Sequence, residues 1–258
     1  MLSKRVVSCF DVRDGKLVKS VKFVNTKEIG EVLGRAREYY EDGLDELVMY
    51  DITASSDGRN IMLETVEAVA AEIFIPFSVG GGIRSVEDAT SLRWAGAEKI
   101  NVNTAAVERP ELIREISEAV GAQSTILSID VLRVSDRKSP SGFEIVTHGG
   151  RNNTGKDALA WAREGERLGA GEIVVNSIDA DGTKDGYDLE LTRAVAEAVS
   201  VPVIASGGAG KPEHLYQVLT EGGADAALIA SMVHYGEYKI SELKQYLHDR
   251  GVKIRMNY

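Results

Sequence analysis

The chain has 258 residues, a net charge of −10 and one cysteine, Cys9. One cysteine excludes an intramolecular disulfide, and no stretch of about 18 apolar residues is present that would span a membrane. The excess of acidic residues argues against a nucleic-acid surface, which needs clustered Lys and Arg. We therefore expect a cytoplasmic protein without a signal peptide and without a membrane or nucleic-acid partner.

Short apolar runs alternate with amphipathic stretches along the chain. The runs lack a polar alternation, which predicts parallel strands buried on both faces. Eight strand–helix units predict a closed (β/α)8 or TIM barrel forming one domain, residues 1–258, with an open doubly wound sheet as the alternative. The predicted strands are Arg5–Cys9, Glu46–Tyr50, Phe77–Val79, Lys99–Val102, Thr125–Ile129, Glu172–Val175, Val203–Ala205 and Ala226–Ile229, and the predicted helices are 31–42, 60–72, 86–95, 110–119, 157–168, 188–198, 212–221 and 239–249.

The sequence contains an internal repeat. Residues Ile75–Gly82 resemble Val201–Gly208 at an offset of 126 positions. Asp11 and Asp130 stand in similar segments 119 positions apart. Two repeated half-barrels, each of four strand–helix units, explain both offsets.

Two aspartates follow predicted strands that face each other across the barrel. Active sites of such barrels lie at the C-terminal ends of the strands. Asp11 follows the first predicted strand and Asp130 the fifth. Two carboxyl groups in different surroundings can serve as acid and base. The alternative for either aspartate alone is a cap on a turn or a helix, but their equivalence in the repeat favours a catalytic pair.

Glycine-rich turns follow the third and seventh predicted strands, and short polar segments follow the fourth and eighth. Glycines let backbone N–H groups approach an anion, and helix N-termini attract one. Because the repeat supplies two such cradles, the simplest ligand carries a phosphate at each end. The predicted phosphate-binding residues are Gly81, Gly82, Asn103 and Thr104 at one cradle and Ser206, Gly207, Gly208, Ala230 and Ser231 at the other.

Three further loops are candidates for substrate contacts. Asp51 and Asp181-Gly182 follow the second and sixth predicted strands and either hold ribose-type hydroxyls or form turns. The loop after the first strand is either a mobile lid or a solvated basic loop. Its lysines are Lys16, Lys19 and Lys22. The histidines lack ligand spacing and no Rossmann fingerprint is present, so we predict no metal and no cofactor.

Four charged residues begin buried strands at the opposite end of the predicted barrel. They are Arg5, Glu46, Lys99 and Glu172. Unpaired buried charge is costly, so we expect the two cations and two anions to form a neutral ring across the barrel floor. By these arguments alone the ring is a stabilising salt cluster.

Two segments are more specific than the glycine turns, which many phosphate-binding barrels share. They are Asn103–Val107 and Asp181–Asp188. With Cys9–Gly15, Asp51–Ser55, Val79–Ile83 and Ala205–Gly210, they make the chain resemble the cyclase subunits of imidazole glycerol phosphate synthase over essentially its whole length. The isomerase one step earlier in that pathway shares the repeat and the paired aspartates, but the two specific segments argue against it.

The resemblance implies a function in histidine biosynthesis. The family's substrate is phosphoribulosyl-formimino-aminoimidazole carboxamide ribonucleotide, which ammonia attacks to give imidazole glycerol phosphate and aminoimidazole carboxamide ribonucleotide. It implies that Asp11 and Asp130 are the general acid and base and that Lys19 belongs to a lid. It also implies a glutaminase subunit that docks on the N-terminal barrel face as a heterodimer and delivers ammonia through the charged ring. A non-catalytic or ammonia-supplying role is the third alternative, against which the intact aspartate pair weighs.

The chain departs from the family pattern at a few positions. Ser20 replaces a glycine after the lid lysine, and Glu31-Val32 replaces Asp-Pro. Asn176 and Ala180 stand where Thr and Arg are common. None of these departures removes a proposed catalytic group.

Overall fold

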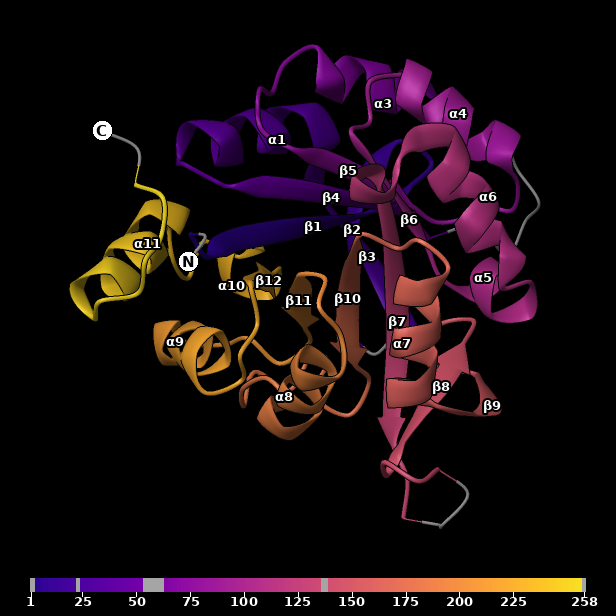
Figure 1. Ribbon diagram of the computed structural model, residues 1–258. Helices are drawn as coiled ribbons and strands as arrows, with labels where there is room; N and C mark the ends of the chain where they lie inside the picture. The colour runs from indigo at the N-terminus through magenta and orange to yellow at the C-terminus, as the bar shows by residue number, and fades with distance from the viewer. Residues whose placement is uncertain (1–2, 22–23, 53–62, 136–138, 257–258) are drawn as a thin grey trace.

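Eight parallel strands close into a barrel, which confirms the predicted (β/α)8 fold (Figure 1). The computed structural model describes residues 3–21, 24–52, 63–135 and 139–256, without the side chains of residues 19–27. In order around the ring the strands are β1 Arg5–Arg13, β4 Glu46–Asp51, β5 Phe77–Gly80, β6 Lys99–Val102, β7 Thr125–Arg133, β10 Glu172–Ser177, β11 Val203–Ser206 and β12 Ala226–Ile229. Strand β12 pairs with β1 and closes the ring.

The helices surround the strands on the outside of the barrel (Figure 1). Most of the predicted helices begin and end within a residue or two of the observed ones. The observed helices are α1 Val32–Glu41, α3 Leu63–Ala70, α4 Val86–Trp94, α6 Glu111–Val120, α7 Ala158–Arg167, α8 Leu189–Ala198, α9 Pro212–Thr220 and α11 Ile240–Asp249, with two short helices, α5 Thr104–Glu108 and α10 Ser231–His234, and one 3-10 turn, Ala122–Ser124. Residues 60–62 of the second predicted helix lie outside the described residues.

Two antiparallel hairpins extend the barrel, one where we predicted a loop and one in the segment after the fifth predicted strand, to which we assigned no element. Strand β1 continues into β2 Lys16–Val21 and β3 Val24–Glu31, and β7 continues into β8 Phe143–Thr147 and β9 Asn152–Asp157. The predicted first and fifth strands are therefore too short. Pairing across the hairpins is the physical reason, because it places Asp11 opposite Val18 and Asp130 opposite Val146.

The predicted lid loop is thus a hairpin over its described part. The backbone of Lys19 lies in β2, while its side chain and all of Lys22 lie outside the described residues. Leu17 and Val18 of the same strand are buried. The burial of Leu17 and Val18, which stand between lysines, explains why this segment forms strand β2 and not a glycine-rich loop.

Side chains alternate between the barrel interior and the helix layer, as the pleat of a strand requires. Val7 and Cys9 belong to the cluster inside the barrel, whereas Val6 and Phe10 pack in the outer core under the helices. Arg5 and Asp11 share the odd-numbered face of β1 with Val7 and Cys9. The N-terminal end of the barrel, or floor, where Arg5 lies, and the C-terminal end, or mouth, where Asp11 lies, are therefore the two ends of one interior.

Local caps fix several of the helices. Ser85 Oγ accepts from Asp88 N at 3.1 Å, and the Asp88 carboxylate accepts from Ser85 N at 3.0 Å, which forms a capping box on α4. Asp157 and Asp188 cap α7 and α8 through their carboxylates. Among the described helices, none is both long and apolar enough to traverse a bilayer.

Candidate active site

Asp11 and Asp130 lie on opposite sides of the barrel mouth. Three strands separate β1 from β7 in either direction around the ring. Both aspartates sit inside their strands, at the point where each leaves the barrel to form a hairpin, and not after the strands as predicted. Asp11 is half-buried and Asp130 is 8% exposed. Two carboxyl groups thus border a common space with different degrees of solvation.

The carboxylate of Asp130 accepts hydrogen bonds from two amides. Asn103 Nδ2 donates to Oδ2 and Asn176 Nδ2 donates to Oδ1, each at 2.9 Å. Burial is the largest influence on its pKa and raises it, and the negative charge of Asp181 acts in the same direction. The two amide donors oppose this, but the pKa of Asp130 stays above that of an ordinary aspartate.

The amide of Asn176 is itself held from the far side. Ser206 Oγ donates to Asn176 Oδ1 at 3.2 Å. Asn103 immediately precedes the short helix α5. A hydrogen-bonded chain therefore runs from Ser206 at one predicted phosphate cradle through Asp130 to Asn103 at the other.

Asp11 has different neighbours at the corresponding positions. Tyr50 of β4 pairs with Asp11 in the strand register. The hydroxyl of Tyr50 accepts from Asn101 Nδ2 at 2.9 Å and lies 3.4 Å from Ser128 Oγ. Burial raises the pKa of Tyr50, which keeps the phenol neutral. Ala230, on the other side, has no polar side chain to offer.

The predicted glycine turns have backbones that exclude side chains. Their φ angles are 93° at Gly81, 71° at Gly82, 92° at Gly207 and 102° at Gly208. A Cβ atom at Gly81 would lie 2.2 Å from the Asp51 carbonyl oxygen, and one at Gly207 would lie 2.7 Å from the Ser177 carbonyl oxygen. Both sterics and conformation require glycine here.

The predicted residues Asn103-Thr104 and Ala230-Ser231 form two matching turns. Asn103 has φ −139° and ψ −100°, and Ala230 has φ −140° and ψ −82°. Thr104 and Ser231 are the first residues of α5 and α10, short helices that the sequence did not reveal. The half-barrel repeat is thus visible in the backbone itself.

The remaining predicted substrate contacts come from neighbouring strand ends. Asp51 is the last residue of β4 and is buried. Asp181 N donates to Ser177 O at 3.0 Å, and Gly182 follows with φ 75°, so this segment forms a turn after β10. Asp181 is close enough to Asp130 to influence its pKa.

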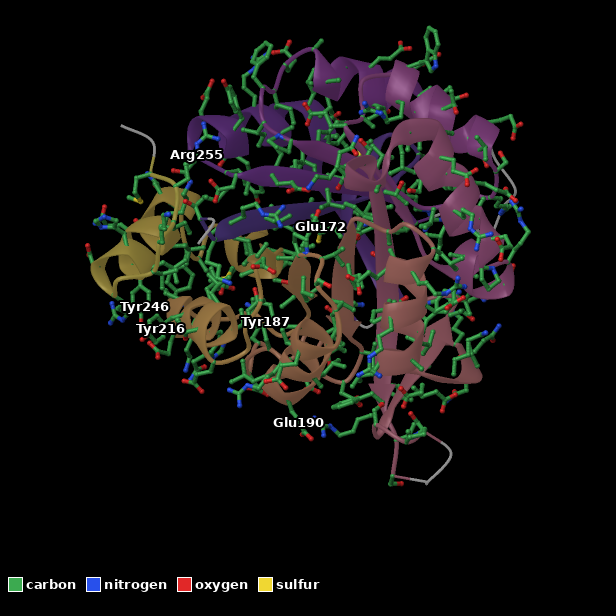
Figure 2. The ribbon with its side chains drawn as sticks, viewed as in Figure 1. Glu172, Tyr187, Glu190, Tyr216, Tyr246 and Arg255 are labelled. Carbon is green, nitrogen blue, oxygen red and sulfur yellow. The ribbon has the colours of Figure 1, made fainter. Side chains whose placement is uncertain are left out.

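The four charged residues predicted for the floor form a closed ring of ion pairs. Arg5 Nη1 lies 2.6 Å from Glu46 Oε2, and the same guanidinium pairs with Glu172. Lys99 Nζ lies 2.9 Å from Glu46 Oε1 and 2.7 Å from Glu172 Oε2. Figure 2 shows Glu172 among the barrel strands near the centre of the molecule.

The glutamates of the ring are buried more deeply than its cations. The side chains of Glu46 and Glu172 are 1% and 6% exposed, against 25% for Arg5 and 18% for Lys99. Burial lowers the pKa of Arg5, but the two carboxylates outweigh it and the net pKa is raised. Burial and the nearby Glu172 raise the pKa of Glu46 against the two cations.

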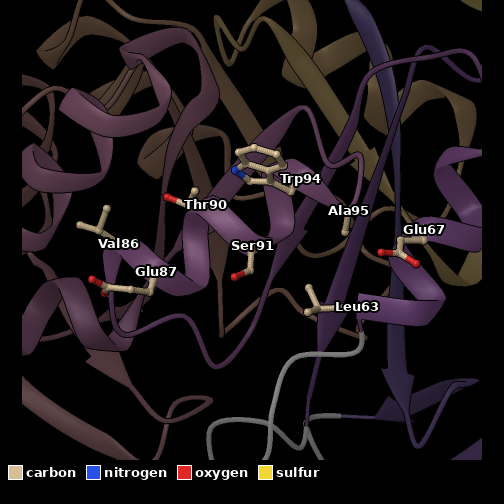
Figure 3. A pocket seen from close by; sticks show the side chains of 8 residues that line it. All are labelled: Leu63, Glu67, Val86, Glu87, Thr90, Ser91, Trp94 and Ala95. Atoms are coloured by element: carbon tan, nitrogen blue, oxygen red, sulfur yellow. The ribbon is translucent and has the colours of Figure 1, made fainter.

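A groove of about 680 Å³ lies away from the mouth, on the outer surface of α3 and α4 (Figure 3). Leu63, Val86 and Trp94 supply its apolar lining, and Glu67 and Glu87 add carboxylates. No predicted site residue lines it. Within the described residues, no group of three or more His, Cys, Asp or Glu side chains is placed to hold a metal ion.

Known proteins resemble this chain over its whole length. A profile of the family described as histidine biosynthesis protein matches residues 5–239. The chain is 58% identical over 259 aligned residues to imidazole glycerol phosphate synthase subunit HisF of Desulfovibrio desulfuricans, covering 100% of both chains. It is 59% identical to the HisF subunit of Syntrophobacter fumaroxidans, over 99% of each chain, and 60% identical to that of Desulfatibacillum aliphaticivorans, over 99% of this chain and 98% of the relative.

The chain therefore belongs to the histidine biosynthesis family of (β/α)8-barrel enzymes. Within that family it stands among the cyclase subunits of imidazole glycerol phosphate synthase, which confirms the resemblance read from the sequence. The chain is thus an enzyme of amino-acid biosynthesis.

Sequence reasoning missed several polar residues around the aspartates. Asn176 was noted only as a departure from the family, and Tyr50 and Asn101 were assigned to strands without a role. Each interrupts an apolar strand run with a polar side chain on the inward face, and that pattern was a usable signal. His234 gives no such signal.

Proposed function

We propose that the chain is the ammonia-dependent lyase–cyclase of histidine biosynthesis. Its substrate would be phosphoribulosyl-formimino-aminoimidazole carboxamide ribonucleotide, and its products imidazole glycerol phosphate and aminoimidazole carboxamide ribonucleotide. The observation that carries the proposal is the pair Asp11 and Asp130, which border the mouth from opposite strands at repeat-related positions. Membership of the cyclase subunits supports the reaction class.

In this proposal the two aspartates share the proton transfers of ring closure and cleavage. A general acid and a general base must differ in protonation state, and their surroundings here do differ. Asp130 is deeply buried with two amide donors, whereas Asp11 is half-buried and flanked by Tyr50 and Ala230. The difference supports separate roles for the two groups.

The two glycine turns support a substrate with a phosphate at each end. Gly81, Gly82, Asn103 and Thr104 would hold one phosphate, and Ser206, Gly207, Gly208, Ala230 and Ser231 the other. Both turns have the positive φ angles that expose consecutive N–H groups to an anion. Asp51, Asp181 and Gly182 would contact the sugar portions between the phosphates, and Lys19 would reach the substrate from the segment after β1.

Ammonia would enter through the opposite end of the barrel. In this proposal a glutaminase subunit docks on the N-terminal face, forms a heterodimer and delivers ammonia past the ring of Arg5, Glu46, Lys99 and Glu172. The relatives are named as subunits of a synthase, which supports a partner. Two exposed aromatics near that face add support. Phe74, 78% exposed, precedes β5, and Trp94, 86% exposed, ends α4 shortly before β6. We place the complex in the cytoplasm.

The direct test is turnover of the ribulosyl substrate with ammonium salt by the isolated chain. We expect imidazole glycerol phosphate and the carboxamide ribonucleotide in equal amounts. Isomerisation of the preceding pathway intermediate, without ammonia consumption, would instead indicate the neighbouring isomerase.

Crystals grown with phosphate or sulfate test the two cradles separately. We expect one anion beside Gly81, Gly82 and Thr104 and a second beside Gly207, Gly208 and Ser231. A single anion at the second cradle would leave only half of the bisphosphate site.

A further inference from the structure

Strand β12 ends before its neighbour β1, and β2 pairs with β1 on the same side only from Asp11 onward. The pairing of β1 with β12 stops at Ser8 and Ile229. Backbone groups of alternate residues point to the same side of a strand. Because the Arg5 N–H bonds toward β12, the Cys9 carbonyl faces the side where β12 has ended. Asp11 lies only two residues further along.

The side chain of His234 occupies this position. Its Nε2 lies 3.0 Å from the Cys9 carbonyl oxygen, and its Nδ1 lies 2.7 Å from the Tyr39 hydroxyl. A carbonyl oxygen only accepts, so Nε2 carries the proton and Nδ1 accepts from the Tyr39 O–H. Tyr39 thereby fixes the tautomer that holds the Cys9 carbonyl.

Close packing keeps the imidazole in one orientation. His234 is 6% exposed and Tyr39 is 3% exposed. Their rings stack with centroids 5.9 Å apart at 9°, and the Phe10 ring lies 5.5 Å from Tyr39 and 5.8 Å from His234. Tightly packed interiors transmit displacement from one element to the next. The imidazole is thus a stiff connection between a helix and a strand.

The connection joins two parts of the proposed site. His234 is the last residue of α10, and Ser231, a proposed phosphate ligand, is the first. One short helix therefore carries a phosphate contact at one end and the contact to β1 at the other. In the first half-barrel the corresponding residue is Val107, 127 positions earlier, and its side chain has no hydrogen-bonding group.

We propose that His234 is a positioning residue that couples phosphate binding at Ser231 to the backbone of the strand that carries Asp11. The inference rests on the proposed function, because it takes Ser231 as a phosphate ligand and Asp11 as a reacting group. An anion that draws the start of α10 shifts the helix as one unit, and the imidazole carries that shift to Cys9. A misplacement of about 1 Å can cost about a hundredfold in rate.

Kinetics of four variants test the coupling at saturating ammonium. His234→Leu removes the hydrogen bonds to Cys9 and Tyr39, and His234→Gln keeps an N–H donor. Tyr39→Phe leaves the imidazole in place but removes the hydroxyl that fixes its tautomer. Val107→Ala is the matched control in the other half-barrel. We expect His234→Leu to lower kcat by about tenfold or more while KM changes less than about threefold. His234→Gln should recover most of kcat, Tyr39→Phe should fall between, and Val107→Ala should keep it.

Backbone NMR supplies a readout that a purely structural role would not move. Inorganic phosphate is titrated into wild type, His234→Leu and Tyr39→Phe while the amide resonances of Asp11 and Val12 are followed. We expect saturable shifts at both amides in wild type, smaller ones in Tyr39→Phe and none in His234→Leu, although phosphate still shifts Ser231.

Two results would overturn the coupling. One is an Asp11 amide that does not respond to phosphate in wild type. The other is a His234→Leu variant whose Asp11 amide responds to phosphate as in wild type and whose kcat is that of wild type. If His234→Leu does not fold, the same two results in Tyr39→Phe would overturn the coupling. A wild-type chain that shows the coupled shift but forms no imidazole glycerol phosphate would contradict the proposed function and leave the coupling standing.

Discussion

The two halves of the barrel share a backbone but surround their aspartates differently. Beside Asp130 both flanking strands supply an amide, Asn103 and Asn176. The corresponding residues beside Asp11 are Ala230 and Tyr50. Asp130 is held through its side chain, whereas the strand of Asp11 is held through its backbone by His234. A repeated half-barrel places two equal carboxyl groups, and substitutions among their neighbours then make them chemically unequal.

The same divergence appears at the floor of the barrel. Glu46 and Glu172 stand 126 positions apart and are equivalent in the repeat. Both cations of the ring, Arg5 and Lys99, come from the first half. The equivalent positions in the second half are Ser124 and Ala226. The cations of the first half therefore neutralise the buried carboxylates of both halves.

Removing either carboxylate is the strongest way to test the comparison. Asp11→Asn and Asp130→Asn should each lower kcat by at least about a hundredfold, the scale for losing a general acid or base. Substrate KM should change much less, since neither group is assigned to a phosphate. Steady-state kinetics with ammonium salt measure both values.

Asp14→Asn is the matched control, because Asp14 is exposed and its φ of 51° is one that Asn tolerates. This variant should keep wild-type activity. Near-wild-type turnover in either active-site variant would refute its assigned role.

The amides around Asp130 should control its protonation. Asn176→Leu removes a donor that favours the ionised carboxylate, so the pKa of Asp130, already raised by burial, should rise further. With Asp130 as the general base, the acid limb of the pH profile of kcat/KM should then move to higher pH. At neutral pH turnover should fall about tenfold, because a hydrogen bond to a charged group contributes about 1.5–3 kcal/mol.

Tyr50→Phe is the matched control for that experiment. Tyr50 occupies the repeat-related position, but its hydroxyl bonds with Asn101. The acid limb should therefore stay in place. An unmoved limb in Asn176→Leu, or an equal movement in both variants, would show that the two halves do not differ in this respect.

Much of the fold could be predicted from the sequence, because the apolar runs and the repeat are strong signals. The first hairpin could not, since Leu17 and Val18 stand among lysines and offer too short a pattern for a strand. The helices α5 and α10 have four or five residues, too few for a helical period to show.

The candidate site was predictable only where residue type and the repeat agreed. The paired aspartates, the glycine turns and the two glutamates of the ring satisfy that condition, whereas Arg5 and Lys99 were predicted from their charge at the start of a strand alone. The link between His234 and Cys9 could not be predicted, because it joins side chain to backbone across 225 positions. Only the observed end of β12 at Ile229 shows why a histidine is needed there.

A smaller effect is expected at the ring of ion pairs on the barrel floor, where cations of the first half neutralise a glutamate of the second. Lys99→Ala removes one of the two cations between Glu46 and Glu172. In the reconstituted complex with a glutaminase, glutamine-dependent turnover should fall about fivefold more than turnover with ammonium salt, a difference of roughly 1 kcal/mol, because only the first route crosses the joined passage. Lys4→Ala, a lysine at the same end of β1 outside the ring, is the control. Equal losses by both routes would mean that the ring only stabilises the barrel.

The smallest expected effect concerns Ser206, whose counterpart in the first half is Gly80. Ser206 Oγ donates to Asn176 Oδ1 at 3.2 Å and so turns the amide N–H toward Asp130. Gly80 cannot be given a similar group, since a Cβ there would lie 2.9 Å from the Tyr50 ring. A neutral hydrogen bond contributes about 0.5–1.5 kcal/mol. Ser206→Ala should therefore lower kcat about threefold if the hydroxyl acts through the amide. If it contacts the substrate phosphate instead, KM should rise and kcat should stay. Combining Ser206→Ala with Asn176→Leu separates the two roles, because a hydroxyl that acts only through the amide adds no further loss of kcat once the amide is gone.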